Sequence, residues 1–188
     1  MLRARLVRMV NSASISMPDR QTTQQNSSLL GSVFLAFLSA FLLDLCFPVA
    51  GPLPPWRAAF AWFALVPLLY ALLSPGSTGG RHPVWRGALL GYLCGVLWYV
   101  LNCYWVYQTM TQYAQGVSAA GGVGILLLFS TVLGLYFGLF GLVLSFLRQK
   151  TGGIVVPLIV APFLWTAIEV LAAHLTSVPW DQLGYSGG

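Results

Sequence analysis

The chain has 188 residues, of which 57% are hydrophobic, 14% aromatic and only 7% charged. A soluble domain is about a quarter charged, so this composition excludes a water-soluble fold and indicates an integral membrane protein. Because a backbone in lipid must satisfy its own hydrogen bonds, the choice lies between helices and a closed barrel. The apolar runs are long and continuous, which predicts an all-α bundle of transmembrane helices.

The formal net charge of +5 would by itself fit a nucleic-acid partner. The basic residues stand at the ends of the apolar runs and form no basic stripe, so we predict no nucleic-acid binding. No paired metal ligands or cofactor-binding motifs occur, and we expect no metal and no cofactor. Three cysteines make no disulfide framework, and we interpret them as small buried apolar residues: Cys46, Cys94 and Cys103.

Residues 1–28 are polar and basic, and we predict a disordered tail, with a weak amphipathic surface helix as the alternative. The first predicted span covers 29–47 and is too long for the apolar core of a signal peptide. Small residues recur in it at every fourth position, which favours close helix packing. These residues are Ser32, Ala36 and Ala40. The stripe ends in Asp44, which is either a functional carboxylate or a group at the membrane interface.

The second predicted span, 58–73, is short, follows a Pro-rich turn and contains Pro67. A loop with His82, interpreted as a solvated residue, leads to the third span at 87–107. That span opens with a doubled G-x-x-x-G pattern formed by Gly87, Gly91 and Gly95. It closes in a run of aromatic residues, which is typical of a membrane interface.

A second stripe of small residues lies on the fourth predicted span, 122–147. Its members are Ser130, Gly134, Gly138, Gly141 and Ser145. The spacing places them on one helix face, so this span should also pack closely against a neighbour.

The last predicted span, 154–175, carries a carboxylate, Glu169. A carboxylate within a span is costly, so a functional role is one hypothesis and a structural hydrogen bond to Asn102 or Thr166 is the other. The helical period predicts a polar or small face directed into protein and an apolar face directed to lipid. The polar or small face holds Pro162, Thr166, Glu169, Ala173 and Thr176. The apolar face holds Leu164, Ile168, Leu171 and Leu175. A catalytic pair of Cys103 and His174 is a minor alternative.

The basic residues predict the orientation of the bundle, because cations collect on the cytoplasmic side. With the N-terminus inside, five spans leave only Arg57 outside and place the C-terminus in the periplasm. The cations then inside are Arg3, Arg5, Arg8, Arg20, Arg81, Arg86, Arg148 and Lys150. The aromatic residues after the third and fifth spans then meet at the outer surface.

Several stretches resemble one family. Ala161–Glu169 reads A-P-F-L-W-T-A-I-E and Pro179–Ser186 reads P-W-D-Q-L-G-Y-S, which is similar to bacterial apolipoprotein N-acyltransferases. Trp62–Leu69 and Tyr104–Tyr107 resemble two further family stretches, in the same order. Ala172 stands where the family usually has an arginine. The resemblance covers about residues 29–186.

The resemblance implies transfer of an acyl chain from a phospholipid to the N-terminal cysteine amino group of a diacylglyceryl lipoprotein, in the bacterial inner membrane. Members of the family carry their catalytic residues in a later nitrilase-like domain, so it implies no catalytic residue here and an inactive membrane portion in 29–186. Six residues are candidates for lipid or substrate contact: Tyr104, Trp105, Tyr107, Glu169, Trp180 and Tyr185. The alternatives are a small transporter or channel subunit and a non-catalytic membrane scaffold.

Overall fold

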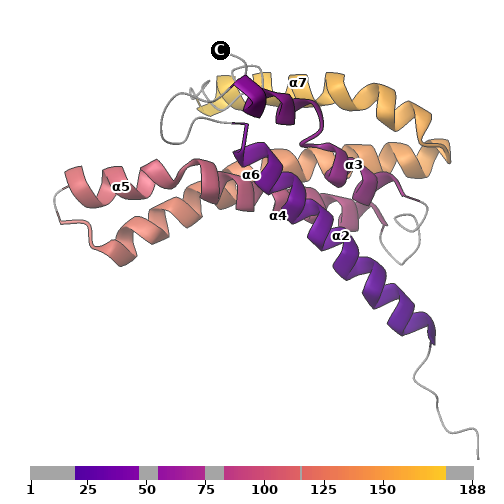
Figure 1. The fold of residues 1–188 in the computed structure, drawn as a ribbon, viewed down its shortest axis with the longest axis horizontal. Helices are drawn as coiled ribbons and strands as arrows, with labels where there is room; N and C mark the ends of the chain where they lie inside the picture. Colours follow the sequence, from indigo (N-terminus) through magenta and orange to yellow (C-terminus); the bar gives the residue numbers. More distant parts are fainter. Residues whose placement is uncertain (1–19, 47–54, 75–82, 115, 177–188) are drawn as a thin grey trace, which may run out of the picture. The chain divides into compact units, whose positions relative to one another are not determined.

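The computed structural model describes residues 20–46, 55–74, 83–114 and 116–176, and every regular element in these ranges is a helix (Figure 1). The elements are α2 (Arg20–Asp44), the 3-10 helix η1 (Pro55–Trp62), α3 (Val66–Leu73), α4 (Pro83–Asn102), α5 (Tyr104–Tyr113), α6 (Ala119–Thr151) and α7 (Val155–Thr176). The chain divides into two compact units, residues 1–31 and 32–188. The predicted all-α class is confirmed for the described residues.

Three of the described helices are long and apolar enough to cross a membrane: α4, α6 and residues 155–175 of α7. They make this a multi-pass membrane protein. The first two predicted spans contain shorter apolar helical stretches, residues 29–44 and 59–73. A hydrocarbon core of about 30 Å needs about 20 helical residues, so these two stretches fall short of that length. The number of five spans stays a prediction.

Helices α4 and α6 pack closely through glycines, as the two predicted stripes require. Gly87, Gly91 and Gly95 are all buried on α4, and an added Cβ on Gly95 would lie 2.7 Å from Phe137 Cβ on α6. An added Cβ on Gly91 would overlap the Phe137 carbonyl oxygen. Since the collision at Gly91 is with backbone, only a hydrogen in place of the side chain there allows the two helices to approach this far.

One end of the α3, α4 and α6 group carries three basic residues. Arg148 donates from Nε to the Leu73 carbonyl at the end of α3 (3.2 Å) and from its guanidinium to Gly152 O (2.6 Å). Gly152 closes α6 with a left-handed conformation, φ +66°, which favours glycine. Arg86 near the start of α4 donates to Ser32 Oγ of α2 (2.8 Å). Lys150 lies in the last turn of α6.

Arg57 lies at the C-terminal end of α2, where its Nε donates to the Leu45 carbonyl (2.9 Å), whereas Arg86 contacts Ser32 in the middle of that helix. The separation of Arg57 from Arg86, Arg148 and Lys150 follows the charge pattern of the sequence. Which of these ends faces the cytoplasm stays a prediction.

Three predicted segments differ from the observed helices. Helix α2 begins at Arg20 and ends at Asp44, so residues 20–28 of the predicted tail are helical. The second segment is a 3-10 helix followed by α3, because Pro67 sits in the first turn of α3, where a missing N–H is tolerated. The third span ends at Asn102, and the aromatic run continues on the separate helix α5. Residues 1–19 and His82 lie outside the described ranges.

Helix α7 packs with a different face from the one predicted. Ala161, Trp165 and Ile168 are buried, whereas Pro162 and Thr166 are exposed. The assignment of Ile168 to lipid was therefore wrong, while Leu171 and Leu175 are exposed as predicted. The Trp165 ring lies edge-on to two α6 rings, and this large apolar contact selects the packed face over the small and polar residues.

Helix α6 has 33 residues and is about 50 Å long at 1.5 Å per residue. This exceeds a hydrocarbon core of about 30 Å, so α6 must tilt or extend beyond it. Its first turns pack against α5: an added Cβ on Gly122 would lie 2.7 Å from Thr111 Cγ2 and 3.1 Å from Tyr107 Cδ2. The α5–α6 pair thus extends beyond the end of α4 at Asn102 and beyond the last turn of α7 (Figure 1).

Candidate functional site

Glu169 is half-buried on α7 and lines a cavity of about 30 Å³ between α4, α6 and α7. Trp98 and Tyr99 of α4 line the same cavity, with Tyr136 and Phe137 of α6. Its remaining lining residues come from α7: Trp165, Ile168 and Ala172. Glu169 therefore lies against other helices of the bundle, as predicted.

The rings around this cavity form one connected cluster centred on Phe137. The Phe137 centroid lies 5.3 Å from Trp98, 6.0 Å from Tyr99 and 4.9 Å from Trp165. Trp165 also meets Phe140 edge-on at 5.2 Å. Edge-to-face contacts of this kind each contribute about 0.5–1.5 kcal/mol beyond the area they bury. The cluster fixes α7 on α6 and thereby fixes the position of Glu169.

Sequence reasoning did not select Trp98, Tyr99 or Trp165 as neighbours of Glu169. Trp165 precedes the glutamate by one helical turn, so the spacing alone could have placed both side chains on adjoining faces. The Trp165 indole Nε1 is buried and has no hydrogen-bond partner among the described residues. A space of about 30 Å³ is large enough for one water molecule.

The three aromatic candidates of the third predicted span lie together on α5. Tyr104 and Trp105 are 47% and 44% exposed, and Tyr107 is half-buried. The Tyr104 and Tyr107 rings stack at 5.5 Å with an interplanar angle of 30°. None of the three lines the Glu169 cavity. The described residues therefore form two separate candidate sites, an exposed aromatic surface on α5 and an inner carboxylate.

The other sequence candidates have different outcomes. Trp180 and Tyr185 lie outside the described residues. Cys46, Cys94 and Cys103 are buried and form no disulfide within the described part of the chain, which confirms their interpretation as small core residues.

The catalytic pair of Cys103 and His174 is not supported. Cys103 is completely buried, whereas His174 is exposed and its Nδ1 lies 2.8 Å from the Val170 carbonyl oxygen. A nucleophile needs access to its substrate, and this thiol has none.

Asp44 does not belong to the Glu169 cavity. It is the last residue of α2, and one of its carboxylate oxygens is buried with no hydrogen-bond partner in the part of the chain that the structure describes. The neighbouring Leu45 carbonyl accepts from Arg57, so a cation lies at the same helix end. Among the residues that the structure describes, no group of three or more potential metal ligands occurs.

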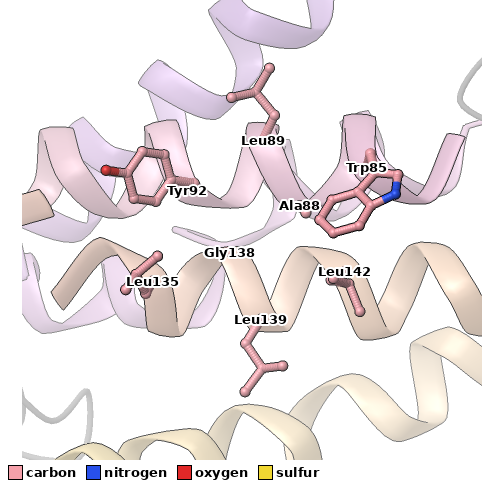
Figure 2. Close-up of a pocket in the computed structure, with 8 residues that line it drawn as sticks. All are labelled: Trp85, Ala88, Leu89, Tyr92, Leu135, Gly138, Leu139 and Leu142. Carbon is pink, nitrogen blue, oxygen red and sulfur yellow. The ribbon is translucent and has the colours of Figure 1, made fainter. Parts of the chain in front are cut away.

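A second and larger hollow runs along the contact between α4 and α6 (Figure 2). Its volume is about 450 Å³. From α4 it is lined by Trp85, Ala88, Leu89 and Tyr92. From α6 it is lined by Leu135, Gly138, Leu139 and Leu142. We call this hollow the α4–α6 groove.

Comparison with known proteins matches residues 39–187 to the family model described as the apolipoprotein N-acyltransferase N-terminal domain. Three curated apolipoprotein N-acyltransferases are similar to the chain. That of Methylococcus capsulatus is 35% identical over 134 residues, which cover 66% of this chain and 26% of the relative. That of Thermotoga maritima is 29% identical over 163 residues, which cover 85% of this chain and 28% of the relative. That of Wigglesworthia glossinidia brevipalpis is 31% identical over 102 residues, which cover 54% of this chain and 20% of the relative. The chain therefore matches between a fifth and somewhat more than a quarter of each relative's length.

Proposed function

The chain belongs to the apolipoprotein N-acyltransferase family, and on that premise we propose that it forms the membrane portion of such an enzyme. The match over residues 39–187 carries the proposal, because it includes the described helices from η1 to α7 and the end of α2. The reaction proposed for the complete enzyme moves an acyl chain from a phospholipid to the amino group of a lipoprotein's N-terminal diacylglyceryl-cysteine. The membrane is proposed to be the bacterial inner membrane.

Both proposed substrates are anchored in lipid, so their reacting groups lie at the membrane surface. Holding them there replaces a slow encounter with a positioned reaction. The α5–α6 pair supports this role, because α6 is too long for the hydrocarbon core and α5 carries exposed Tyr104 and Trp105. Aromatic side chains of this kind favour the headgroup level of a bilayer. We assign Tyr104, Trp105, Tyr107, Glu169, Trp180 and Tyr185 as candidate contacts.

This chain alone is proposed to be inactive, since the family's catalytic set belongs to a domain outside the matched region. The test incubates the purified 188-residue chain with phospholipid and a diacylated lipopeptide, and follows the peptide mass. We expect no added acyl chain. An N-acylated peptide would contradict the proposed inactivity.

A chimera tests the proposed membrane role directly. The segment of the Methylococcus capsulatus relative that aligns with this chain is replaced by this chain, and the chimera is expressed in cells depleted of their own acyltransferase. We expect N-acylated lipoprotein to reappear, measured by mass spectrometry. A chimera that inserts at normal levels and leaves lipoproteins diacylated would argue against the proposal.

A further inference from the structure

The α4–α6 groove differs from the candidate contact sites in position and chemistry. It runs from Trp85 to Tyr92 on α4, seven residues or about 10 Å. Figure 2 shows Trp85 and Tyr92 at its two ends, with Leu139 between them on the α6 side. The wall side chains Trp85 and Leu89 are 69% and 55% exposed. An occupant in contact with this groove must itself be apolar.

The groove has room for an apolar chain laid along it. Its volume is about 450 Å³, and its walls on both helices are apolar. A lipid acyl chain is apolar, thin and abundant at this depth of a membrane.

The charge beyond the Trp85 end indicates which lipid. Leu142 lines the groove, and Phe146 and Lys150 follow it at intervals of four residues, on the same face of α6. Lys150 is exposed, and its Nζ lies 5.7 Å from the centre of the Phe146 ring. Two turns of helix, about 12 Å, therefore separate the apolar wall from an ammonium group.

The electrostatic field at this end is positive for a second reason. Arg86 and Arg148 lie at the same end, where Arg86 joins α4 to α2 and Arg148 joins α6 to α3. The acidic residues of the described ranges are Asp44 and Glu169, at the far end of α2 and in the inner cavity. Basic sites between transmembrane helices favour anionic headgroups.

We propose that the α4–α6 groove binds one acyl chain of an anionic phospholipid whose phosphate lies against Lys150 and the Trp85 indole. This lipid site lies at the cation-rich end, away from the aromatic surface of α5. It therefore goes beyond the proposed acyl transfer and does not depend on it. The bound lipid would serve to anchor the α4–α6 pair in the leaflet on that side.

Native mass spectrometry of the 188-residue chain in detergent tests the site, with phosphatidylglycerol and phosphatidylethanolamine as probes. We expect one phosphatidylglycerol to bind about fivefold more tightly than phosphatidylethanolamine, the effect of about one lysine near a headgroup. Lys150→Gln should reduce this difference, because it weakens phosphatidylglycerol more than phosphatidylethanolamine, whose own ammonium already offsets its phosphate. Lys150→Arg should keep the difference. Lys150 is the only lysine of the sequence, so no other lysine can replace it.

Leu139→Trp should fill the groove and weaken both lipids, whereas Leu158→Trp on an exposed part of α7 should change neither. Thermal unfolding of each variant shows that it is folded. Equal binding of the two lipids to the unmodified chain would overturn the proposal. So would unchanged binding in both Lys150→Gln and Leu139→Trp. A dimer that Leu139→Trp abolishes would assign the groove to a second copy and overturn it as well.

Discussion

Trp165 is the residue through which α7 is held in the bundle, because its ring contacts both Phe137 and Phe140. Trp165→Ala removes these contacts and leaves a cavity. We expect the free energy of unfolding to fall by about 3 kcal/mol, the lower end of the range for such truncations. The lower end applies because lipid is as apolar as the protein core, so moving the site from core to lipid costs little. The lost packing contacts therefore account for most of the decrease in unfolding free energy. Unfolding of the detergent-solubilised chain by heat or denaturant measures it.

Two variants show whether packing is the cause. Trp165→Phe keeps an aromatic ring and removes an indole N–H that no described residue accepts, so it should cost less than half as much as Trp165→Ala. Trp62 is 89% exposed, and Trp62→Ala should leave the unfolding free energy nearly unchanged. Equal losses in Trp165→Ala and Trp62→Ala would contradict the assignment of Trp165 as the packing residue.

Inserting Glu169 into the membrane costs about 2.5–3.5 kcal/mol. If its role is functional, a variant without the carboxylate should lose activity although it is no less stable. In the chimera described above, we expect Glu169→Leu to lower lipoprotein N-acylation at least about tenfold. This corresponds to the loss of one hydrogen bond to a charged group, about 1.5–3 kcal/mol. Glu169→Gln keeps the shape and much of the hydrogen-bonding capacity, and should retain more activity.

The amount of inserted chimera serves as the control for this comparison. Leucine is favourable within a span, so Glu169→Leu should insert at least as well as the parent. Full acylation by an inserted Glu169→Leu chimera would assign Glu169 a structural role only.

At the scale of the elements, α4 and α6 depend on two glycines that face each other, Gly91 and Gly141. Gly91→Ala places a methyl group against backbone that cannot yield without separating the helices. We expect a loss of about 1–3 kcal/mol in unfolding free energy. Gly124 is a matched control on α6, since nothing lies within 4 Å of an added Cβ. Gly124→Ala should be neutral or stabilising by up to about 1 kcal/mol, and equal effects of the two variants would refute the close contact.

The glycine contacts of α4 and α6 could be predicted because a four-residue spacing of small residues has few other uses in a membrane helix. The end of α4 at Asn102 could not, since neither proline nor glycine marks it. The sequence pattern also could not predict which face of α7 packs against the bundle. Its polar and small residues suggested one face, but the rings of α6 that determine the contact belong to a distant part of the sequence.

For the candidate site too, one part could be predicted from the sequence and another part could not. Glu169 stood out because a charged residue in an apolar span is rare, and in the structure it lies against other helices. Its aromatic neighbours on α4 follow only from the three-dimensional arrangement, since Trp98 and Tyr99 read as ordinary apolar positions in a long span. The separation of Tyr104 and Trp105 from Glu169 likewise depends on the helix break at Cys103.

For the whole molecule, the remaining question is which end of the bundle faces the cytoplasm. Arg86, Arg148 and Lys150 lie at one end of the α4–α6 pair, and α5 extends from the other. Since cations near span ends are retained inside, we predict that the 152–154 turn is cytoplasmic and that the segment before α6 is periplasmic. Fusions after Gly153 and after Val117, with a reporter active only in the periplasm, measure this directly.

We expect the reporter to be inactive after Gly153 and active after Val117 and after Leu175. The charges can be tested independently of the fusions, because Arg148 and Lys150 are the basic residues of the last turn of α6. Replacing both with glutamine should increase periplasmic exposure of the 152–154 turn, since each cation removed weakens the bias. Periplasmic activity after Gly153 in the unmodified chain would invert the bundle. The α5 aromatic surface would then lie in the cytoplasm, away from the periplasm where the proposed acyl transfer needs it.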